Sequence, residues 1–211
     1  YAWKGSSSPE GTSFCVRCPL HNDHDVAWFT LHQSLCSLGM FVQSIKFVEN
    51  HNGNKKDISI YGQEYTSATY KLAKMNLAIR GIAANFGDVA ADTFFKDQHP
   101  DLKADYIMAN PPFNVDGVDK DKLAGDKRFP FGIPNPDNGN YLWIQAFYSA
   151  LNEKGRGGFV MANSAGDAGH SEKEIRRQLI ESATPNLFKL LGQFTADDHS
   201  PAFPQNIRQI T

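Results

Sequence analysis

The chain has 211 residues, of which 41% are hydrophobic and 21% charged, so it has the composition of an ordinary globular domain with one core. No apolar run has the length of a membrane span, and the first residues lack the charged-then-apolar pattern of a signal peptide. The formal net charge of −2 argues against a protein that holds nucleic acid unaided. Three cysteines, an odd number, argue against a disulfide framework and indicate a reducing cytoplasm.

Residues 1–25 are rich in Ser, Gly, Pro and His and show neither helical nor strand periodicity, so we expect an irregular N-terminal segment. The segment includes a run of potential metal ligands, Cys15, Cys18, His21 and His24. Zinc sites usually separate the two pairs of ligands by a longer loop, and this spacing leaves little chain for tetrahedral geometry. We therefore expect no metal site.

The rest of the chain alternates between short strand-like and longer helix-like segments. Strands are expected at residues 26–31, 58–62, 106–109 and 159–162. Helices are expected at residues 40–49, 66–80, 140–151 and from 171 onward. This alternation predicts an α/β fold with a doubly wound, mainly parallel sheet.

Three of these segments carry more specific expectations. The helix at 66–80 has an apolar stripe that we expect to be buried, formed by Ala68, Leu72, Met75 and Ile79. The last helix is expected to open with a capping box formed by Ser171 and Glu174. The glycine-rich stretch 155–158 is expected to be a turn before the strand at 159–162.

The stretch around which the chain is organised follows the strand at 106–109 and reads Asn110, Pro111, Pro112, Phe113. Pro111 has no backbone N–H and keeps Asn110 extended, so strand pairing must stop there. The Asn110 side-chain oxygen and the Pro111 carbonyl offer two acceptors to an exocyclic amino group, and Phe113 offers a stacking face to a flipped base. Catalysis would then rest on positioning and electrostatics. The alternative is a plain strand followed by a rigid turn.

Two other regions have candidate roles. Glu64 follows the strand at 58–62, where an acidic residue of a nucleotide-binding fold accepts hydrogen bonds from ribose hydroxyls, or it is an ordinary loop glutamate. The long segment 115–138 is dense in Gly, Pro, Asp and Lys, and it contacts the DNA backbone, closes over the flipped base or is a solvated loop. Its candidate phosphate contacts are Lys120, Lys122, Lys127 and Arg128.

Residues 110–113 resemble the N-P-P-F/Y motif of amino-group DNA methyltransferases. Further blocks that narrow the resemblance are residues 62–64, 72–77, 99–105 and 158–163. Over about residues 40–182 the chain resembles the modification (M) subunit of type I restriction-modification systems, an adenine-N6 DNA methyltransferase. The resemblance implies a Rossmann-like catalytic domain at 26–182 and a divergent C-terminal tail at 183–211. Because neither end of the chain resembles the family, we expect the fold to be incomplete at both ends.

The resemblance also implies S-adenosylmethionine as cofactor, with Gly39, Glu64 and Asp92 as its binding residues. Glu64 would bind the ribose and Asp92 the adenine amino group, although an isolated Asp92 is more often a turn or cap residue. Just before Met40 the family has an acidic residue and a Gly-rich turn, and residues 34–39 keep only Gly39 of that pattern. One hypothesis is that the reading frame differs upstream of about Gly39.

The function predicted by this resemblance is methyl transfer from S-adenosylmethionine to adenine N6 in DNA. The implied partners are DNA and the specificity (S) and restriction (R) subunits of a type I system, and little DNA binding is expected of this chain alone. One alternative is methylation of another amino or amide group, such as cytosine N4 or a protein glutamine. Another is a non-catalytic remnant whose cofactor turn is degraded.

Overall fold

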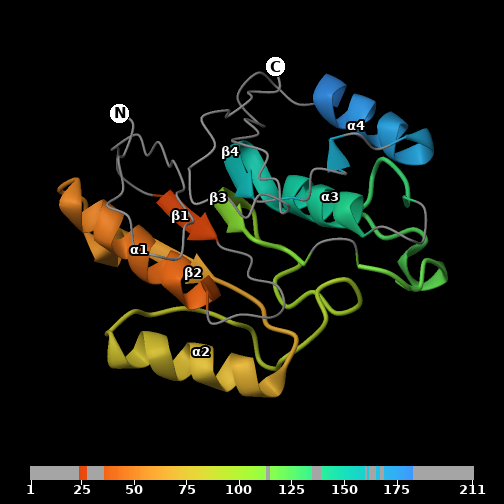
Figure 1. Cartoon of the computed structure of the whole chain (residues 1–211). Coiled ribbons are helices and arrows are strands. Elements are labelled where there is room, and N and C mark those ends of the chain that lie inside the picture. Colours follow the sequence, from red (N-terminus) through yellow and green to blue (C-terminus); the bar gives the residue numbers. More distant parts are fainter. Residues whose placement is uncertain are drawn as a thin grey trace, which may run out of the picture.

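The computed structural model describes residues 24–27, 36–112, 115–134, 139–159, 161, 165–166 and 169–182. Within this part of the chain, four strands form one sheet in the order β2-β1-β3-β4 (Figure 1). They are β1 (His24–Ala27), β2 (Ile58–Tyr61), β3 (Ala104–Ala109) and β4 (Leu151–Phe159). Every neighbouring pair is parallel, and Val26 of β1 lies opposite Ile60 of β2 and Tyr106 of β3. The expected α/β fold with a parallel sheet is confirmed.

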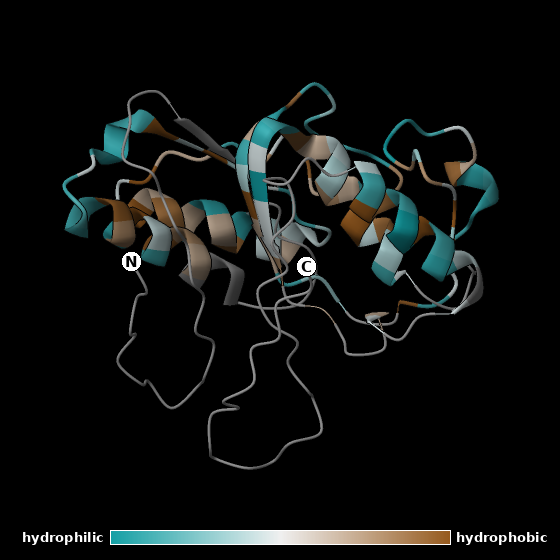
Figure 2. Cartoon of the chain, turned by 90° about the horizontal axis from the view of Figure 1, so that it is seen from above, coloured by the Kyte–Doolittle hydropathy of each residue, from teal (hydrophilic) through white to brown (hydrophobic). Residues whose placement is uncertain are grey.

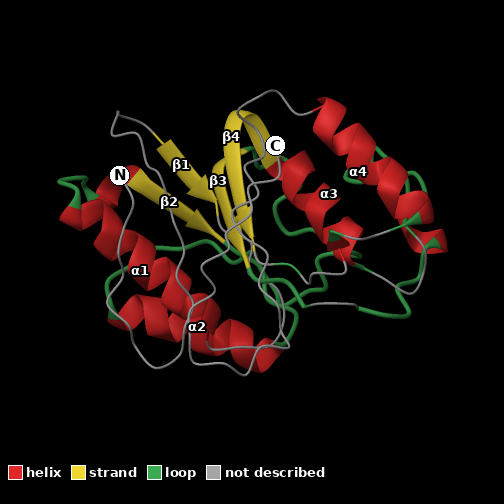
Figure 3. Ribbon diagram, turned by 45° about the horizontal axis from the view of Figure 1, so that its top comes forward, coloured by secondary structure: helices red, strands yellow, loops and turns green. Residues whose placement is uncertain are grey.

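Helices lie on both sides of this sheet (Figure 3). One side has α1 (Cys36–Asn50) and α2 (Ser67–Ile79), and the other has α3 (Asn140–Ala150) and α4 (His170–Ser182). Two short 3-10 turns, Lys55–Asp57 and Asp121–Leu123, lie in the connections. Figure 2 shows hydrophilic and hydrophobic residues together on the helices, as expected of helices that bury one face. Among the described residues, no helix is long and apolar enough to cross a membrane.

Two clusters of buried residues fill the two sides of the sheet. The larger cluster joins α3 and α4 to β3 and β4. The smaller cluster consists of Phe41, Ile45, Ile60, Tyr70, Ala73, Leu77, Phe86 and Met108. β3 contributes to both, because Ile107 and Ala109 belong to the larger cluster and Met108 to the smaller. Burial on both faces accounts for the uninterrupted apolar run in this strand.

The strand order reverses at the centre of the sheet. β1 and β3 are neighbours, β2 lies outside β1, and β4 lies outside β3. The chain therefore proceeds outward from the centre in two opposite directions. Ligands of α/β sheets bind beside such a reversal, at the carboxyl ends of the strands. The fold thus directs attention to the residues that follow β1, β2 and β3.

Most predicted elements lie where the sequence places them, since β2, α2, α3 and β3 each start and end within two residues of expectation. β1 begins two residues earlier than expected, and residues 28–31 of the predicted first strand lie outside the described residues. α1 begins at Cys36, four residues before the expected start at Met40. Gly39 therefore lies inside the first turn of a helix and not in a turn that precedes it.

The two ends of α2 are stabilised by local capping contacts. The side-chain oxygen of Thr66 accepts a hydrogen bond from the backbone N of Thr69 at 3.3 Å and caps the first turn. Gly81 follows the last turn with φ of +64°, a left-handed conformation that glycine adopts without strain. These two residues fix the length of α2 and with it the position of the preceding segment 62–65.

The predicted buried stripe of α2 is wrong. Met75 is 56% exposed and Ile79 is 77% exposed, whereas the buried residues of the helix are Tyr70, Ala73 and Leu77. α2 is apolar on two opposite faces, so periodicity alone could not tell which face the sheet would cover. The face with Tyr70 is buried because its ring packs edge-on against Phe86 and its hydroxyl donates to the Gly87 carbonyl at 2.7 Å.

The expected turn at residues 155–158 is also wrong, because these glycines lie inside β4. Gly157 and Gly158 pair with Ile107 and Met108 of β3. A Cβ at position 155 would lie only 2.7 Å from the Ala104 carbonyl oxygen, so glycine there allows a close approach of β4 to β3. The predicted strand at 159–162 overlaps β4 only at Phe159.

The capping box predicted for α4 is absent as well. The helix begins at His170, so Ser171 lies within the first turn, where the backbone N of Lys173 bonds to the Gly169 carbonyl at 3.3 Å. Glu174 instead pairs with Arg177 on the exposed face of the helix. An ion pair between residues three apart replaces the expected interaction with the helix terminus.

Candidate functional site

Two of the predicted site residues lie just after strands that end at the same edge of the sheet. Asn110 comes directly after β3, and Glu64 comes three residues after the end of β2. Since the strands are parallel, both follow carboxyl ends at the same edge. β1 lies between β2 and β3, so the two strand ends are separated by two interstrand spacings, roughly 10 Å. The structure therefore places both residues beside the point where the strand order reverses.

The end of β3 has the expected form. β3 stops at Ala109, and Asn110 is exposed while Pro111 is buried and Pro112 is half-buried. The buried proline anchors the backbone, and the exposed amide extends from a rigid support. In the described part of the chain, the Asn110 side chain forms no hydrogen bond, so its oxygen is available to a ligand. Phe113, the predicted stacking residue, lies outside the described residues.

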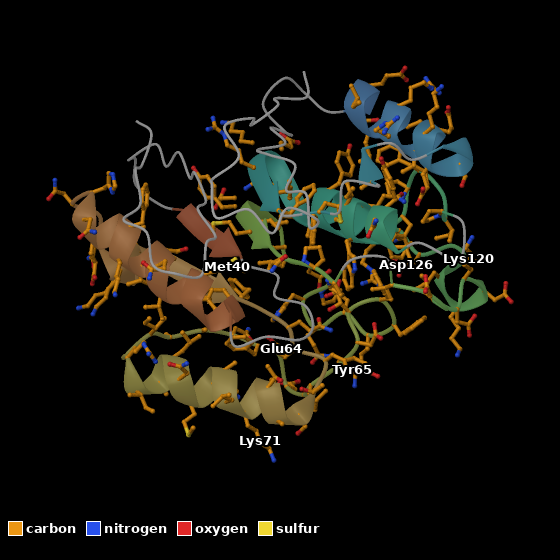
Figure 4. All side chains as sticks on the ribbon, viewed as in Figure 1. Met40, Glu64, Tyr65, Lys71, Lys120 and Asp126 are labelled. Carbon is orange, nitrogen blue, oxygen red and sulfur yellow. The ribbon has the colours of Figure 1, made fainter. Side chains whose placement is uncertain are left out.

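Glu64 is a buried acid that has no partner among the described residues. Its residue is 3% exposed and lies on the connection between β2 and α2, beside the exposed Tyr65 (Figure 4). Among the described residues, its carboxyl group has neither a hydrogen-bond partner nor an ion pair. Burial consequently raises the pKa of Glu64 to about 7. A carboxyl group in this position can accept hydrogen bonds from a ligand that donates them.

Gly62, two residues before this acid, is held by close packing. A Cβ at Gly62 would lie 2.9 Å from the Phe86 ring and 3.4 Å from the Phe41 ring, so only glycine fits between the strand end and the smaller core. The Gly62 N–H donates to the Asn85 carbonyl at 2.9 Å, and the Gly62 carbonyl lies 2.9 Å from His99 Nε2. The backbone that leads to Glu64 is therefore fixed in position.

Gln63 is a structural residue whose role the sequence reasoning missed. It is fully buried, and its amide nitrogen donates to the carbonyls of Ala91 at 3.0 Å and Lys96 at 2.8 Å. Its amide oxygen accepts from the Gln98 backbone N at 2.9 Å. These three bonds fasten the loop at 91–98 to the end of β2. A polar residue next to an acid at a strand end was the only available signal, because its partners lie about 30 positions away.

Asp92 is brought to the same edge by this loop. The Ala91 N–H donates to the Glu64 carbonyl at 2.9 Å, so Asp92 lies one residue from the backbone of the buried acid. One oxygen of Asp92, Oδ1, accepts from the Phe94 backbone N at 2.8 Å, which is the turn role left open by the sequence. In the part of the chain that the structure describes, its Oδ2 forms no hydrogen bond and can accept from a ligand.

The described part of the segment that follows β3 is packed against the protein and is not a simple solvated loop. Leu123 and Phe129 are buried in the larger core, and the Gly139 N–H donates to the Val115 carbonyl at 3.0 Å, which joins the two ends of the segment. Of the predicted phosphate contacts, Lys122 pairs with Asp119 at 2.9 Å. Arg128 bonds to protein groups described below.

A metal centre finds no support in the described residues, which contain no group of three or more His, Cys, Asp or Glu side chains that could hold an ion. Cys15, Cys18 and His21 lie outside those residues. The fourth member of that run, His24, lies in β1, but its side chain is not described.

A parallel sheet with helices on both sides, and polar groups at strand ends beside a reversal of strand order, is the layout of an α/β domain that binds a nucleotide-like ligand. The chain belongs to the N-6 DNA Methylase family, whose model matches residues 30–186.

Individual relatives agree with this family. The chain is 40% identical to the type I restriction enzyme HindI methylase subunit of Haemophilus influenzae, over 78% of this chain and 38% of that protein. It is 39% identical to the MjaIX methylase subunit of Methanocaldococcus jannaschii, over 75% of this chain and 29% of that protein. The chain thus spans well under half the length of these relatives.

A solved structure shows the same fold. The type I restriction-modification system methyltransferase subunit from Streptococcus thermophilus superposes with a TM-score of 0.61 at 20% sequence identity. The match covers 76% of this chain and 34% of that chain. The two chains therefore share a fold.

Proposed function

We propose that this chain is the catalytic part of a type I methylase subunit and transfers a methyl group from S-adenosylmethionine to adenine N6 in DNA. The observation that supports this best is that the residues after two strands, β2 and β3, lie at the same edge of the sheet. One presents an exposed amide on a rigid support, and the other a buried acid that has no partner in the part of the chain that the structure describes. Because the chain belongs to the N-6 DNA Methylase family, we assign the amide to the substrate and the acid to the cofactor. The sheet would then be a doubly wound, Rossmann-like methyltransferase sheet within a domain at residues 26–182.

The residues at the end of β2 fit the cofactor. The two oxygens of Glu64 suit the two hydroxyls of a ribose, since a buried carboxylate gains most from donors that reach it in the interior. Asp92 Oδ2 would accept from the adenine amino group. Gly39 lies in the first turn of α1, which follows β1 at the central reversal of the sheet, where backbone N–H groups of a helix start are available to a ligand. When bound, S-adenosylmethionine supplies an electrophilic methyl group.

The residues at the end of β3 fit the substrate. The Asn110 side-chain oxygen and the Pro111 carbonyl would accept the two hydrogens of the adenine amino group and orient its nitrogen toward the methyl donor. Both acceptors bind more strongly as positive charge develops on that nitrogen, so they lower the barrier more than they strengthen ground-state binding. Pro112 keeps the turn rigid, and Phe113 would stack on the flipped base.

The proposed partners follow from charge and from the relatives. The net charge of −2 provides little general attraction to DNA, so sequence recognition and most phosphate contacts would come from a specificity subunit. A restriction subunit would complete a cytoplasmic complex. The rival proposal is a non-catalytic remnant, which is favoured by the absence of an acidic residue and a Gly-rich turn at residues 34–39.

Calorimetric titration of the purified chain with S-adenosylmethionine separates the two proposals. We expect binding in the wild type, weakened by about 1–3 kcal/mol in Glu64→Ala, the scale of hydrogen bonds to a charged group. Glu174→Ala, which removes an exposed acid on α4, is the matched control and should bind as the wild type does. Absence of wild-type binding would favour the remnant.

Transfer of a radioactive methyl group then identifies the substrate. With the chain assembled on a specificity subunit, we expect label in adenine of duplex DNA. Label in cytosine, in RNA or in a protein glutamine would contradict the adenine assignment and leave the cofactor assignment intact.

A further inference from the structure

The side chain of Arg128 is committed to the protein and not to solvent. Its Nε lies 3.1 Å from both carboxylate oxygens of Asp126, and its Nη2 lies 2.6 Å from Asp126 Oδ2. The same guanidinium donates to the backbone carbonyls of Thr93 at 2.5 Å and Phe94 at 2.6 Å. Asp97 lies 3.8 Å from Nη1, and the side chain is 19% exposed. Arg128 is therefore a poor candidate for the phosphate contact suggested by its sequence.

These bonds join two segments that are far apart in the sequence. Arg128 lies in the segment that connects the end of β3 to α3, and Thr93 and Phe94 belong to the turn that begins at Asp92. Asp126 and Lys120 lie on that connecting segment in Figure 4, at a distance from Glu64. In the proposed function, one segment follows the substrate residues and the other carries a cofactor residue.

Each segment is fixed on its own side, so Arg128 acts between two firm supports. On one side, Ser149 of α3 donates to the Arg128 carbonyl at 2.8 Å, and Gln145 of α3 bonds to the backbone of Phe131 and Gly132. On the other side, Gln63 holds the loop at 91–98 to the end of β2.

The geometry requires an arginine. A guanidinium has five N–H donors in a planar fork and can serve one carboxylate and two carbonyls together, whereas a lysine ammonium on a single stem cannot match that fork. Burial raises the pKa of the Asp126 carboxyl, but the hydrogen bonds and charge of Arg128 outweigh burial and hold the pKa below its ordinary value. The pair thus stays ionised while the fork reaches across to the turn.

We propose that Arg128 is a positioning residue that sets the Asp92 turn from the substrate side of the molecule, so that the cofactor site is ordered only when the segment after β3 is in place. This inference rests on the proposed function for the identity of the ligand at Asp92. It rests on the contacts alone for the link between the two segments.

Hydrogen exchange followed by mass spectrometry tests the link without any ligand. In Arg128→Ala we expect faster exchange at residues 91–98 and 126–132, with the strands and α2 unchanged. The matched control is Arg177→Ala, which removes an exposed arginine that also pairs with two carboxylates, Glu174 and Glu181. It should leave residues 91–98 as they are in the wild type.

Titration with S-adenosylmethionine tests the consequence. Arg128→Ala should bind about tenfold more weakly than the wild type, a change typical of coupling between sites, and Arg177→Ala should bind equally well. Arg128→Lys keeps a charge beside Asp126 and should retain the fold by circular dichroism, yet it should show most of the loss. If Arg128→Ala does not fold, the hydrogen exchange and the cofactor affinity of Arg128→Lys test the inference.

The two failures are distinguishable. Unchanged exchange at 91–98 in a folded Arg128 variant overturns the inference, and so does wild-type affinity for the cofactor in that variant. If the wild type binds no cofactor, the proposed function fails, and the exchange at 91–98 alone then supports or overturns the link.

Discussion

The ends of β2 and β3 are built in opposite ways. Residues 62–64, which follow β2, are buried: Gly62 lies against two aromatic rings, Gln63 bonds to a distant loop, and Glu64 has no partner among the described residues. Asn110 after β3 is exposed, and its order comes from the buried Pro111. The contrast suits a site in which a small ligand enters a fixed interior position while a large substrate approaches from outside. It also separates residues whose loss should affect stability from those whose loss should affect only the proposed reaction.

Removal of the Asn110 amide should have the largest effect of all, and it should change catalysis without changing the residues after β2. Asn110→Ala should lower kcat by about 10²- to 10³-fold, or about 3–4 kcal/mol, because a preorganised acceptor acts mainly in the transition state. Cofactor affinity and the free energy of unfolding should change little. Single-turnover methylation by the chain assembled with a specificity subunit measures the effect. Full activity in this variant would refute the proposed mechanism.

The buried end should instead show a pH dependence. The folded pKa of Glu64 is about 7 and its ordinary value is 4.5, so the folded chain holds a proton that the unfolded chain releases between these values. The free energy of unfolding should therefore fall as pH rises from about 4.5 to 7 and level off above, by up to about 3 kcal/mol.

Urea denaturation at pH 5 and pH 8 measures this dependence. In Glu64→Gln, which keeps the shape and removes the charge, the decrease between the two pH values should be smaller by the same amount. An equal decrease in both proteins would show that Glu64 is not the group responsible. In the wild type, cofactor affinity should rise over the same pH range, because the ionised carboxylate is the better acceptor.

The support beneath Glu64 can be removed without touching the acid. Gln63→Ala leaves the carbonyls of Ala91 and Lys96 and the Gln98 N–H without their partner, and should lower the free energy of unfolding by about 2 kcal/mol. Denaturation at a single pH measures the loss. An unchanged free energy of unfolding would mean that the 91–98 loop is held mainly by other contacts, such as those of Arg128.

The smallest effect is expected on the outer, exposed face of α2, which belongs to neither strand end. Met75→Lys should change stability by less than about 0.5 kcal/mol, because the side chain is already 56% exposed. Leu77→Ala, on the buried face of the same helix, should cost about 2–5 kcal/mol. Similar losses in the two variants would mean that the outer face is covered in solution.

Local sequence was a good guide where the physical cause is local. The end of β3 could be predicted because Pro111 stops pairing whatever surrounds it, and the limits of α2 because Thr66 and Gly81 act on adjacent residues. The position of Glu64 after β2 follows from the same kind of reasoning. That it has no partner among the residues of known position does not, because this property depends on everything packed around it.

Other features depend on contacts that no local pattern contains. The choice between the two apolar faces of α2 is made by Phe86 and Gly87, which follow the helix. The glycines of β4 resemble a turn until Gly155 is seen against the Ala104 carbonyl. Arg128 resembles a surface cation until the Asp92 turn is placed beside it.

The Gln63 amide also has a consequence for the order in which the chain folds. Its three partners lie 28, 33 and 35 positions further along the sequence, so these bonds close a long loop and cannot form with the first local structure. During synthesis Gln63 emerges well before Gln98, and its amide must remain hydrated until that later segment follows. Contacts of this separation form slowly. The wall of the site between residues 91 and 98 should therefore assemble after the local structure of α2, whose hydrogen bonds join residues only four positions apart.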